Sequence, residues 1–297
     1  MGIPKLQVGM AGLGRVSKFH ATNFLQRPCA ELVAAFSPDP TEIAWGRVNL
    51  EPHRVTLYDN YNEMLKHPGL QAVAIGTATS VHADQVIKAI DVELHVLCEK
   101  PLSIHIDLCK AAVNAAKKKS HLKMMRGFSR RFDDSYREAY RKVEQGLIGR
   151  PSIIRSQTSV QTELKKQKDC DNSLGIVEFQ NGKIAKYYCS RMMAHGQEDT
   201  TEIIGTEGKL ARSHVNYYHG GGITREVPSN FRDRFGPAFV QKANDVTAAC
   251  LDNTPLPMKL SNAVKAVGIG AYLQEALVTG KQIHFDEIGR RIEKAQL

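Results

Sequence analysis

Long apolar runs, paired cysteines and clustered charge of one sign are all scarce in this sequence. No apolar run in the 297 residues approaches the roughly 18 uninterrupted positions that a membrane helix needs. The six cysteines form no Cys-x-x-Cys pair and have no histidines at metal-ligand spacing, which predicts reduced thiols and no metal site. The first residues contain no apolar signal core. We therefore expect a cytoplasmic protein without a membrane partner.

The charge balance is basic, with 40 Lys and Arg against 31 Asp and Glu and a formal net charge of +9. The basic residues are scattered among the acidic ones, which favours a solvated surface over a nucleic-acid interface. We expect no nucleic-acid partner. The positive field would also suit an anionic substrate or the phosphates of a cofactor.

The first 126 residues alternate apolar strand-like runs with amphipathic helical segments. Such alternation is typical of a parallel sheet covered by helices, because parallel strands need crossover connections. The sequence predicts a doubly wound α/β Rossmann domain over residues 1–126. The expected strands are Leu6–Ala11, Leu32–Phe36, Thr56–Tyr58, Ala72–Ile75, His95–Cys98 and Lys123–Met125.

The pattern changes after Gly127. One helix is expected over Asp133–Gln145, followed by short strand-like segments, two of them separated by the hairpin signal Asn181-Gly182. Two long helical segments follow at Gly236–Leu251 and Ser261–Thr279. These features predict an α+β second domain over 127–297 with a mainly antiparallel sheet.

A glycine-rich turn joins the first strand to the first helix. Gly12 permits a tight turn, Gly14 lets a pyrophosphate approach the backbone, and the small Ser17 stands where a third glycine is usual. The N–H groups of the helix N-terminus favour an anion there. We expect this turn to bind the dinucleotide through Gly12, Leu13, Gly14, Arg15 and Val16.

The end of the second strand leaves the choice between NAD and NADP open. An acidic residue usually binds the ribose hydroxyls of NAD there, but Phe36 is followed by Ser37. A serine does not repel the 2′-phosphate of NADP, whereas Asp39, two residues on, could still reach the ribose of NAD. Both residues belong to the expected cofactor site.

Several segments together resemble one family, the glucose-fructose oxidoreductase and inositol dehydrogenase family (Gfo/Idh/MocA), in particular its inositol 2-dehydrogenase-like members. Besides the glycine turn, a Glu-Lys-Pro sequence follows the fifth strand at 99–101. The resemblance extends over nearly the whole chain. Its remaining segments are Thr77–His82, Gly127–Asp133 and Ile203–Lys209.

The resemblance implies a homo-oligomeric NAD(P)-dependent oxidoreductase that transfers a hydride between nicotinamide and a hydroxyl carbon of a cyclic polyol or sugar. It implies cofactor contacts from Thr77, His82 and Glu99. We expect Arg131 to contact the substrate, with pairing to Asp133 or Asp134 as the alternative. Lys100 is the expected catalytic residue and a further cofactor contact. It stands at the carboxyl end of a central strand, where burial would lower its pKa and let it move the hydroxyl proton.

One family element has no counterpart. The Asp-x-x-x-His element of the second domain is missing, and the chain is apparently shortened near 160–170, which predicts an internal deletion. Without the usual histidine, Lys100 would act alone, and a catalytically impaired dinucleotide-binding regulator is the alternative function. We interpret the remaining candidate histidines as surface residues (His195, His214, His219) or as packing or backbone-bonding residues (His20, His82).

Overall fold

A computed structural model describes residues 4–159, 171–192, 196–212, 216–219, 222–225, 228–258, 260–286 and 290–292. The chain divides into two compact units. The first takes in Met1–Arg131 and Phe239–Gly280, and the second takes in Phe132–Ala238 and Lys281–Leu297. This division differs from the predicted boundary at 126/127, because the two C-terminal helical segments pack mostly with the first unit.

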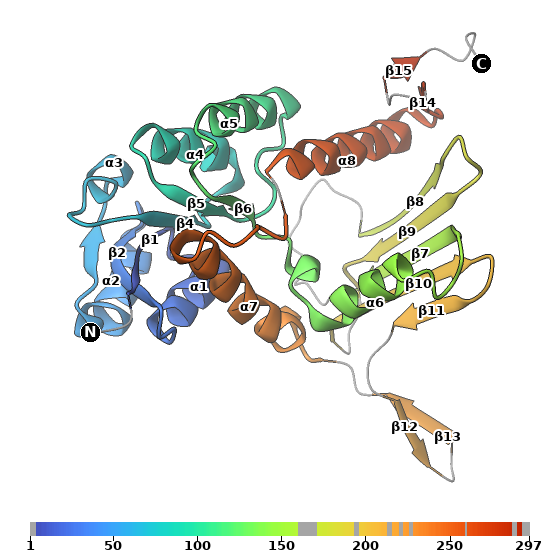
Figure 1. The fold of residues 1–297 in the computed structure, drawn as a ribbon, viewed down its shortest axis with the longest axis horizontal. Coiled ribbons are helices and arrows are strands. Elements are labelled where there is room, and N and C mark those ends of the chain that lie inside the picture. The colour runs from blue at the N-terminus through green and yellow to red at the C-terminus, as the bar shows by residue number, and fades with distance from the viewer. Residues whose placement is uncertain are drawn as a thin grey trace. The chain divides into compact units, whose positions relative to one another are not determined.

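The first unit is built on a six-stranded parallel sheet, as the sequence predicted. The order of its strands is β3-β2-β1-β4-β5-β6 (Figure 1). The chain moves outward from β1 on both sides, so the order reverses between β1 and β4. In open α/β sheets, ligands bind at such a reversal, outside the carboxyl ends of the strands. The strands are β1 (Leu6–Ala11), β2 (Ala30–Phe36), β3 (Thr56–Tyr58), β4 (Ala72–Ile75), β5 (His95–Cys98) and β6 (Met124–Arg126).

Helices cover both faces of this sheet. One face packs on α3 (Tyr61–Met64), α4 (His82–Asp91), α5 (Ile106–Lys118) and α8 (Ser261–Thr279) in a continuous apolar core. On the other face lie α1 (Arg15–Leu25) and the later part of α7 (Phe231–Leu251), where the rings of Phe19 and Phe239 meet at 6.0 Å. The short helix α2 (Pro40–Asn49) follows β2. The C-terminal helices therefore complete the layers that cover the sheet.

Helix α7 begins five residues before the expected Gly236. Proline is common in the first helical turn, but Pro237 lies beyond it here. The side chain of Asn230 caps the helix by accepting hydrogen bonds from the backbone N–H groups of Arg232 and Asp233. Pro237 then lies inside the helix.

The second unit is built on a five-stranded mixed sheet in the order β11-β10-β7-β9-β8. Only β7 and β9 pair in parallel, so the sheet is mainly antiparallel, as predicted. Its strands are β7 (Pro151–Ser159), β8 (Asn172–Glu178), β9 (Ile184–Ser190), β10 (Glu198–Gly205) and β11 (Lys209–Arg212). Helix α6 (Asp134–Glu144) lies against β11.

Two hairpins of this unit were not foreseen, β12 (Asn216–His219) with β13 (Gly222–Arg225) and β14 (His284–Phe285) with β15 (Arg291–Ile292). The predicted turn at Asn181-Gly182 does join β8 and β9, with Gly182 at a positive φ of 77°. Within the described part of the chain, no helix has the length and apolarity to cross a membrane.

Candidate active site

The carboxyl ends of β1, β4, β5 and β6 bring the sequence-predicted residues to one edge of the first sheet. The glycine turn follows β1, Thr77 follows β4, and Glu99 and Lys100 follow β5. These residues lie at one edge because the strands pair in parallel and β1 is next to β4.

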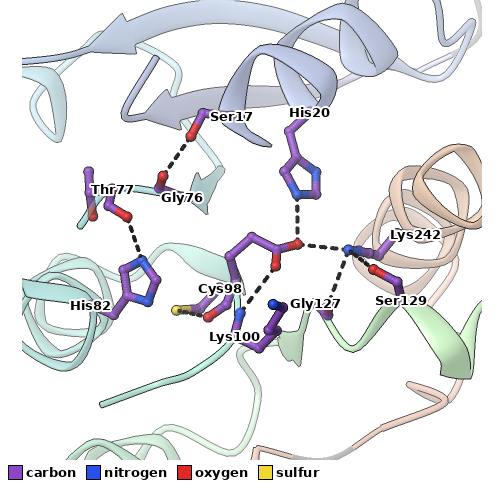
Figure 2. A network of polar contacts seen from close by, with 11 residues as sticks. Ser17, His20, Gly76, Thr77, His82, Cys98, Lys100, Gly127, Ser129 and Lys242 are labelled. Atoms are coloured by element: carbon purple, nitrogen blue, oxygen red, sulfur yellow. Dashed lines mark hydrogen bonds and ion pairs between the residues drawn. The ribbon is translucent and has the colours of Figure 1, made fainter. Parts of the chain in front are cut away.

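The glycine turn has the tight geometry that a dinucleotide needs. Gly12 has a φ of 89°, and a Cβ there would lie 3.0 Å from the backbone of Thr77. Ser17 in α1 donates a hydrogen bond to the Gly76 carbonyl at 2.6 Å, which ties the helix to the end of β4 (Figure 2). Helix α1 has no side-chain cap and no acidic residue in its first turn. Its N-terminal N–H groups therefore offer donors to an anion.

The two residues expected at the ribose have different surroundings. Asp39 caps α2, because its carboxylate accepts hydrogen bonds from the Thr41 backbone N–H and hydroxyl, both at 2.7 Å. Ser37 is buried and its hydroxyl donates to Glu42 Oε2 at 2.6 Å. Glu42, which was not predicted as a site residue, lies in the first turn of α2, three residues after Asp39.

A buried polar network surrounds Glu99 (Figure 2). Its Oε1 lies 2.9 Å from His20 Nε2 of α1 and 2.7 Å from Lys242 Nζ of α7. Its Oε2 accepts the backbone N–H of Lys100 at 3.2 Å. A Cβ on Gly127 would lie 2.3 Å from Oε1, so only glycine fits beside this carboxylate. Glu99 thus holds the start of the Lys100 segment in place, and its cofactor contact stays a prediction.

Lys242 is the central cation of this network. Besides Glu99, its ammonium donates to the Gly127 carbonyl at 3.0 Å and lies 3.5 Å from Ser129 Oγ and 3.9 Å from the centre of the Phe239 ring. Its side chain is completely buried. Sequence reasoning missed Lys242, because a single lysine in a helix 143 residues from Glu99 shows no pattern that marks it as buried.

Burial and pairing set the charges of the network. Burial alone would raise the pKa of Glu99, but the attraction of Lys242 and the hydrogen bond from His20 outweigh it and lower that pKa. Burial lowers the pKa of His20 and of Lys242, while Glu99 opposes both shifts. We therefore assign an ionised Glu99–Lys242 pair beside a neutral His20 whose Nε2–H donates to the carboxylate.

Arg126, at the end of β6, is a second buried cation at this edge. None of its guanidinium nitrogens has a hydrogen-bond partner among the described residues, and the group lies 5.3 Å from the centre of the Phe128 ring. Burial lowers its pKa. With Lys242 and Lys100, it adds positive charge beside the Glu99 carboxylate, which favours an anionic ligand.

Lys100 itself is exposed, whereas the sequence analysis expected it to be buried. Its peptide bond to Pro101 is cis. The buried ring of His82 lies 2.7 Å from the Pro101 carbonyl and 3.0 Å from the Thr77 carbonyl, so it joins the segments that follow β4 and β5. The Thr77 hydroxyl donates to Gln85 at 2.6 Å. The cofactor contacts expected of Thr77 and His82 stay predictions.

The other candidates are distributed over the chain. His20 packs on the Phe239 ring, as expected, and also pairs with the Glu99 carboxylate. His195 and His214 lie outside the described residues, as does the shortened segment near 160–170, and His219 ends β12. Arg131 is exposed at the end of a 3-10 turn, and its substrate contact stays a prediction. Among the described residues, no group of His, Cys, Asp and Glu is arranged to hold a metal.

Comparisons with known proteins agree with this geometry. Residues 6–128 match the model of the oxidoreductase family with an NAD-binding Rossmann fold, and residues 155–211 match the Gfo/Idh/MocA C-terminal domain. The chain is 27% identical to the scyllo-inositol 2-dehydrogenase (NAD(+)) of Bacillus subtilis, over 90% of this chain and 93% of that protein. It is 23% identical to the myo-inositol 2-dehydrogenase of Thermotoga maritima, over 71% and 76% of the two chains.

A solved structure is similar over almost its whole length. The scyllo-inositol dehydrogenase of Lactobacillus casei, with bound NAD(H) and scyllo-inositol, aligns with a TM-score of 0.85 and 25% identity over 93% of this chain and 98% of that one. The fold, the glycine turn and both family matches lead to one assignment. The chain belongs to the Gfo/Idh/MocA family of oxidoreductases and carries its NAD-binding Rossmann domain.

Proposed function

We propose that this protein is an NAD-dependent dehydrogenase that oxidises a ring hydroxyl of a cyclic polyol of the inositol class. The observation that carries the proposal is the placement of the glycine turn and Lys100 at one edge of the sheet, beside the order reversal between β1 and β4. The similarity to inositol dehydrogenases over nearly their whole length supports the substrate class.

Lys100 is the proposed catalytic residue. NAD, when bound, accepts the hydride that leaves the hydroxyl-bearing carbon. The amine of Lys100 takes the hydroxyl proton as the C–O single bond becomes a carbonyl, and it returns the proton in the reverse direction. The exposed position of Lys100 in the first unit leaves its amine accessible to a substrate.

The Glu99 network positions this lysine. The contacts of Glu99 with His20 and Lys242 fix the carboxylate, and the carboxylate fixes the backbone N–H of Lys100. Preorganisation of this kind matters because small displacements of a catalytic group lower the rate steeply.

The missing Asp-x-x-x-His element should lower the turnover rate without changing the class of reaction. The alignment with the Bacillus subtilis enzyme runs over 322 positions although it uses only 90% of this 297-residue chain, so that enzyme has residues without a counterpart here. This supports the predicted internal deletion. The alternative, an impaired dinucleotide-binding regulator, has no support among these relatives, and we expect turnover slowed by the loss of the second proton-transfer group.

A homo-oligomer is part of the same proposal. Leu174 and Ile176 of β8, which point to one face of the second sheet, are each 57% exposed. A second copy covering them would remove apolar surface from water. The cytoplasmic location stays a prediction.

The test is an initial-rate assay of NAD reduction with myo-inositol, scyllo-inositol and an open-chain polyol as the control. We expect turnover with at least one inositol and none after Lys100→Ala, while that variant still binds NADH. A folded wild-type protein that binds NADH but oxidises no cyclic polyol would contradict the proposal.

A further inference from the structure

Glu42, in the first turn of α2, places a carboxylate between the glycine turn and the end of β2. Its Oε2 accepts the backbone N–H of Leu13 at 3.0 Å and the hydroxyl of Ser37 at 2.6 Å. Its Oε1 lies 3.1 Å from the position that a Cβ on Gly14 would take. One side chain therefore contacts both segments that a Rossmann domain uses to hold the adenosine half of a dinucleotide.

No basic side chain among the described residues pairs with the Glu42 carboxylate. Both of its hydrogen-bond donors are neutral, and no ion pair found among the described residues includes Glu42. The side chain is half-buried, so water screens this charge less than it would at an exposed position.

The acid that the sequence pointed to is already engaged. Asp39 Oδ1 accepts both hydrogen bonds from Thr41 and so caps α2. The same cap fixes the first turn of the helix, and this turn carries Glu42.

We propose that Glu42 is the residue by which this protein selects NAD over NADP. This inference rests on the proposed function, since it requires that the first unit bind a dinucleotide. A carboxylate at this place accepts hydrogen bonds from the ribose hydroxyls of NAD. It repels the 2′-phosphate of NADP, which carries close to two negative charges at neutral pH.

Glu42 takes the place of the acid that is usual directly after β2. Ser37, which stands at that place, acts as a donor that orients the Glu42 carboxylate. The absence of an acid at 37 therefore does not indicate a site adapted to NADP.

The experiment is a pair of fluorescence titrations of the purified full chain, one with NADH and one with NADPH. The measured quantity is the ratio of the two dissociation constants. The ratio reports only the effect of the 2′-phosphate, because both ligands have the same pyrophosphate. If a substitution at Glu42 frees the Leu13 N–H, any gain in affinity applies to both ligands and cancels in the ratio. For the wild type, we expect NADH to bind at least about tenfold more tightly than NADPH.

Glu42→Gln should lower this ratio by roughly tenfold or more, because the amide keeps the shape and removes the charge. Glu51→Gln is the matched control, since it makes the same substitution at an exposed position of the first unit and should leave the ratio unchanged. A wild type that prefers NADPH, or a Glu42→Gln variant with an unaltered ratio, would overturn the inference.

Two further outcomes keep the test decisive. If Glu42→Gln does not fold, Glu42→Ala is measured in its place, and the wild-type ratio is a test in itself. A folded wild type that binds neither dinucleotide would overturn the proposed function as well, whereas tight binding of both with equal constants would overturn only the selection by Glu42.

Discussion

Glu99 and Lys242 form a buried ion pair with 2.7 Å between Oε1 and Nζ, although 143 residues separate them in the chain. The pair joins the end of β5 to helix α7 within the first unit. Because it also fixes the backbone before Lys100, it links the stability of this unit to the geometry of the proposed active site.

Removal of one partner of this pair should be costly. Lys242→Ala leaves the Glu99 carboxylate buried without its cation, and we expect a loss of about 3–5 kcal/mol in the free energy of unfolding. The measurement is urea denaturation of the wild type and the variant. The double variant Glu99→Gln with Lys242→Met removes both charges and should recover most of this loss. A Lys242→Ala protein as stable as the wild type would show that the pair is not formed.

His20 should make the stability depend on pH. Burial lowers its folded-state pKa below the usual 6.5, so the unfolded chain takes up a proton at a pH where the folded protein does not. Stability should therefore decrease as the pH falls below 6.5 towards the folded-state value. His20→Gln keeps a donor to Glu99 and cannot titrate, so its stability should fall less steeply between about pH 7.5 and 5.5.

The measurement for His20 is the urea midpoint across this pH range, with the exposed His53→Gln as the control. The slope of the free energy of unfolding against pH should be smaller in His20→Gln by up to about 1.4 kcal/mol per pH unit. His67 and His95, whose pKa values burial also lowers, should maintain part of the slope. Identical slopes in the wild type and His20→Gln would contradict a neutral His20 in the folded state.

Gly12→Ala should weaken dinucleotide binding. A Cβ at this position meets the backbone of Thr77 at 3.0 Å, so the turn must move away from the end of β4. We expect NADH to bind at least roughly tenfold more weakly in a fluorescence titration. Gly69→Ala is the matched control, because Gly69 also has a positive φ, 80°, but a Cβ there meets nothing within 4 Å. If both substitutions weaken NADH binding equally, the loss comes from backbone strain at a positive φ and not from displacement of the glycine turn.

Charge on the exposed face of β8 should change the oligomeric state. If a second copy covers Leu174 and Ile176, Ile176→Lys would bury an unpaired ammonium in that interface and shift the protein towards the monomer. Light scattering after size-exclusion chromatography measures this shift. Lys186→Ala, at the paired position on β9, alters the same face without burying a charge. A wild type that is monomeric at all concentrations would refute the homo-oligomer.

Local patterns predicted most of the fold. β1, β3, β4 and β5 have the bounds expected from their apolar runs, because a buried parallel strand needs such a run and the flanking turns end it. The start of α7 was misplaced because the prediction did not use Asn230 as a helix cap. The predicted domain boundary differs from that of the compact units because α7 and α8 pack on the first sheet, a long-range contact that no local pattern shows.

The parts of the candidate site that belong to a sequence motif were predicted. The parts that depend on tertiary contacts were missed. The glycine turn and the Glu-Lys-Pro sequence were visible in the chain. Lys242 and Glu42 act through contacts with residues 143 and 29 positions away, and neither stands in a motif. The cofactor contacts expected of Glu99 and Asp39 stay predictions.

The most direct test of the central claim is the transfer of deuterium from C4-deuterated NADH to the ketone of an inositol, followed by mass spectrometry of the product. The account predicts an inositol that is one mass unit heavier in the wild type, and no labelled product with Lys100→Ala despite retained NADH binding. A folded wild type that binds NADH and transfers no deuterium would contradict the assignment of this protein as a polyol dehydrogenase.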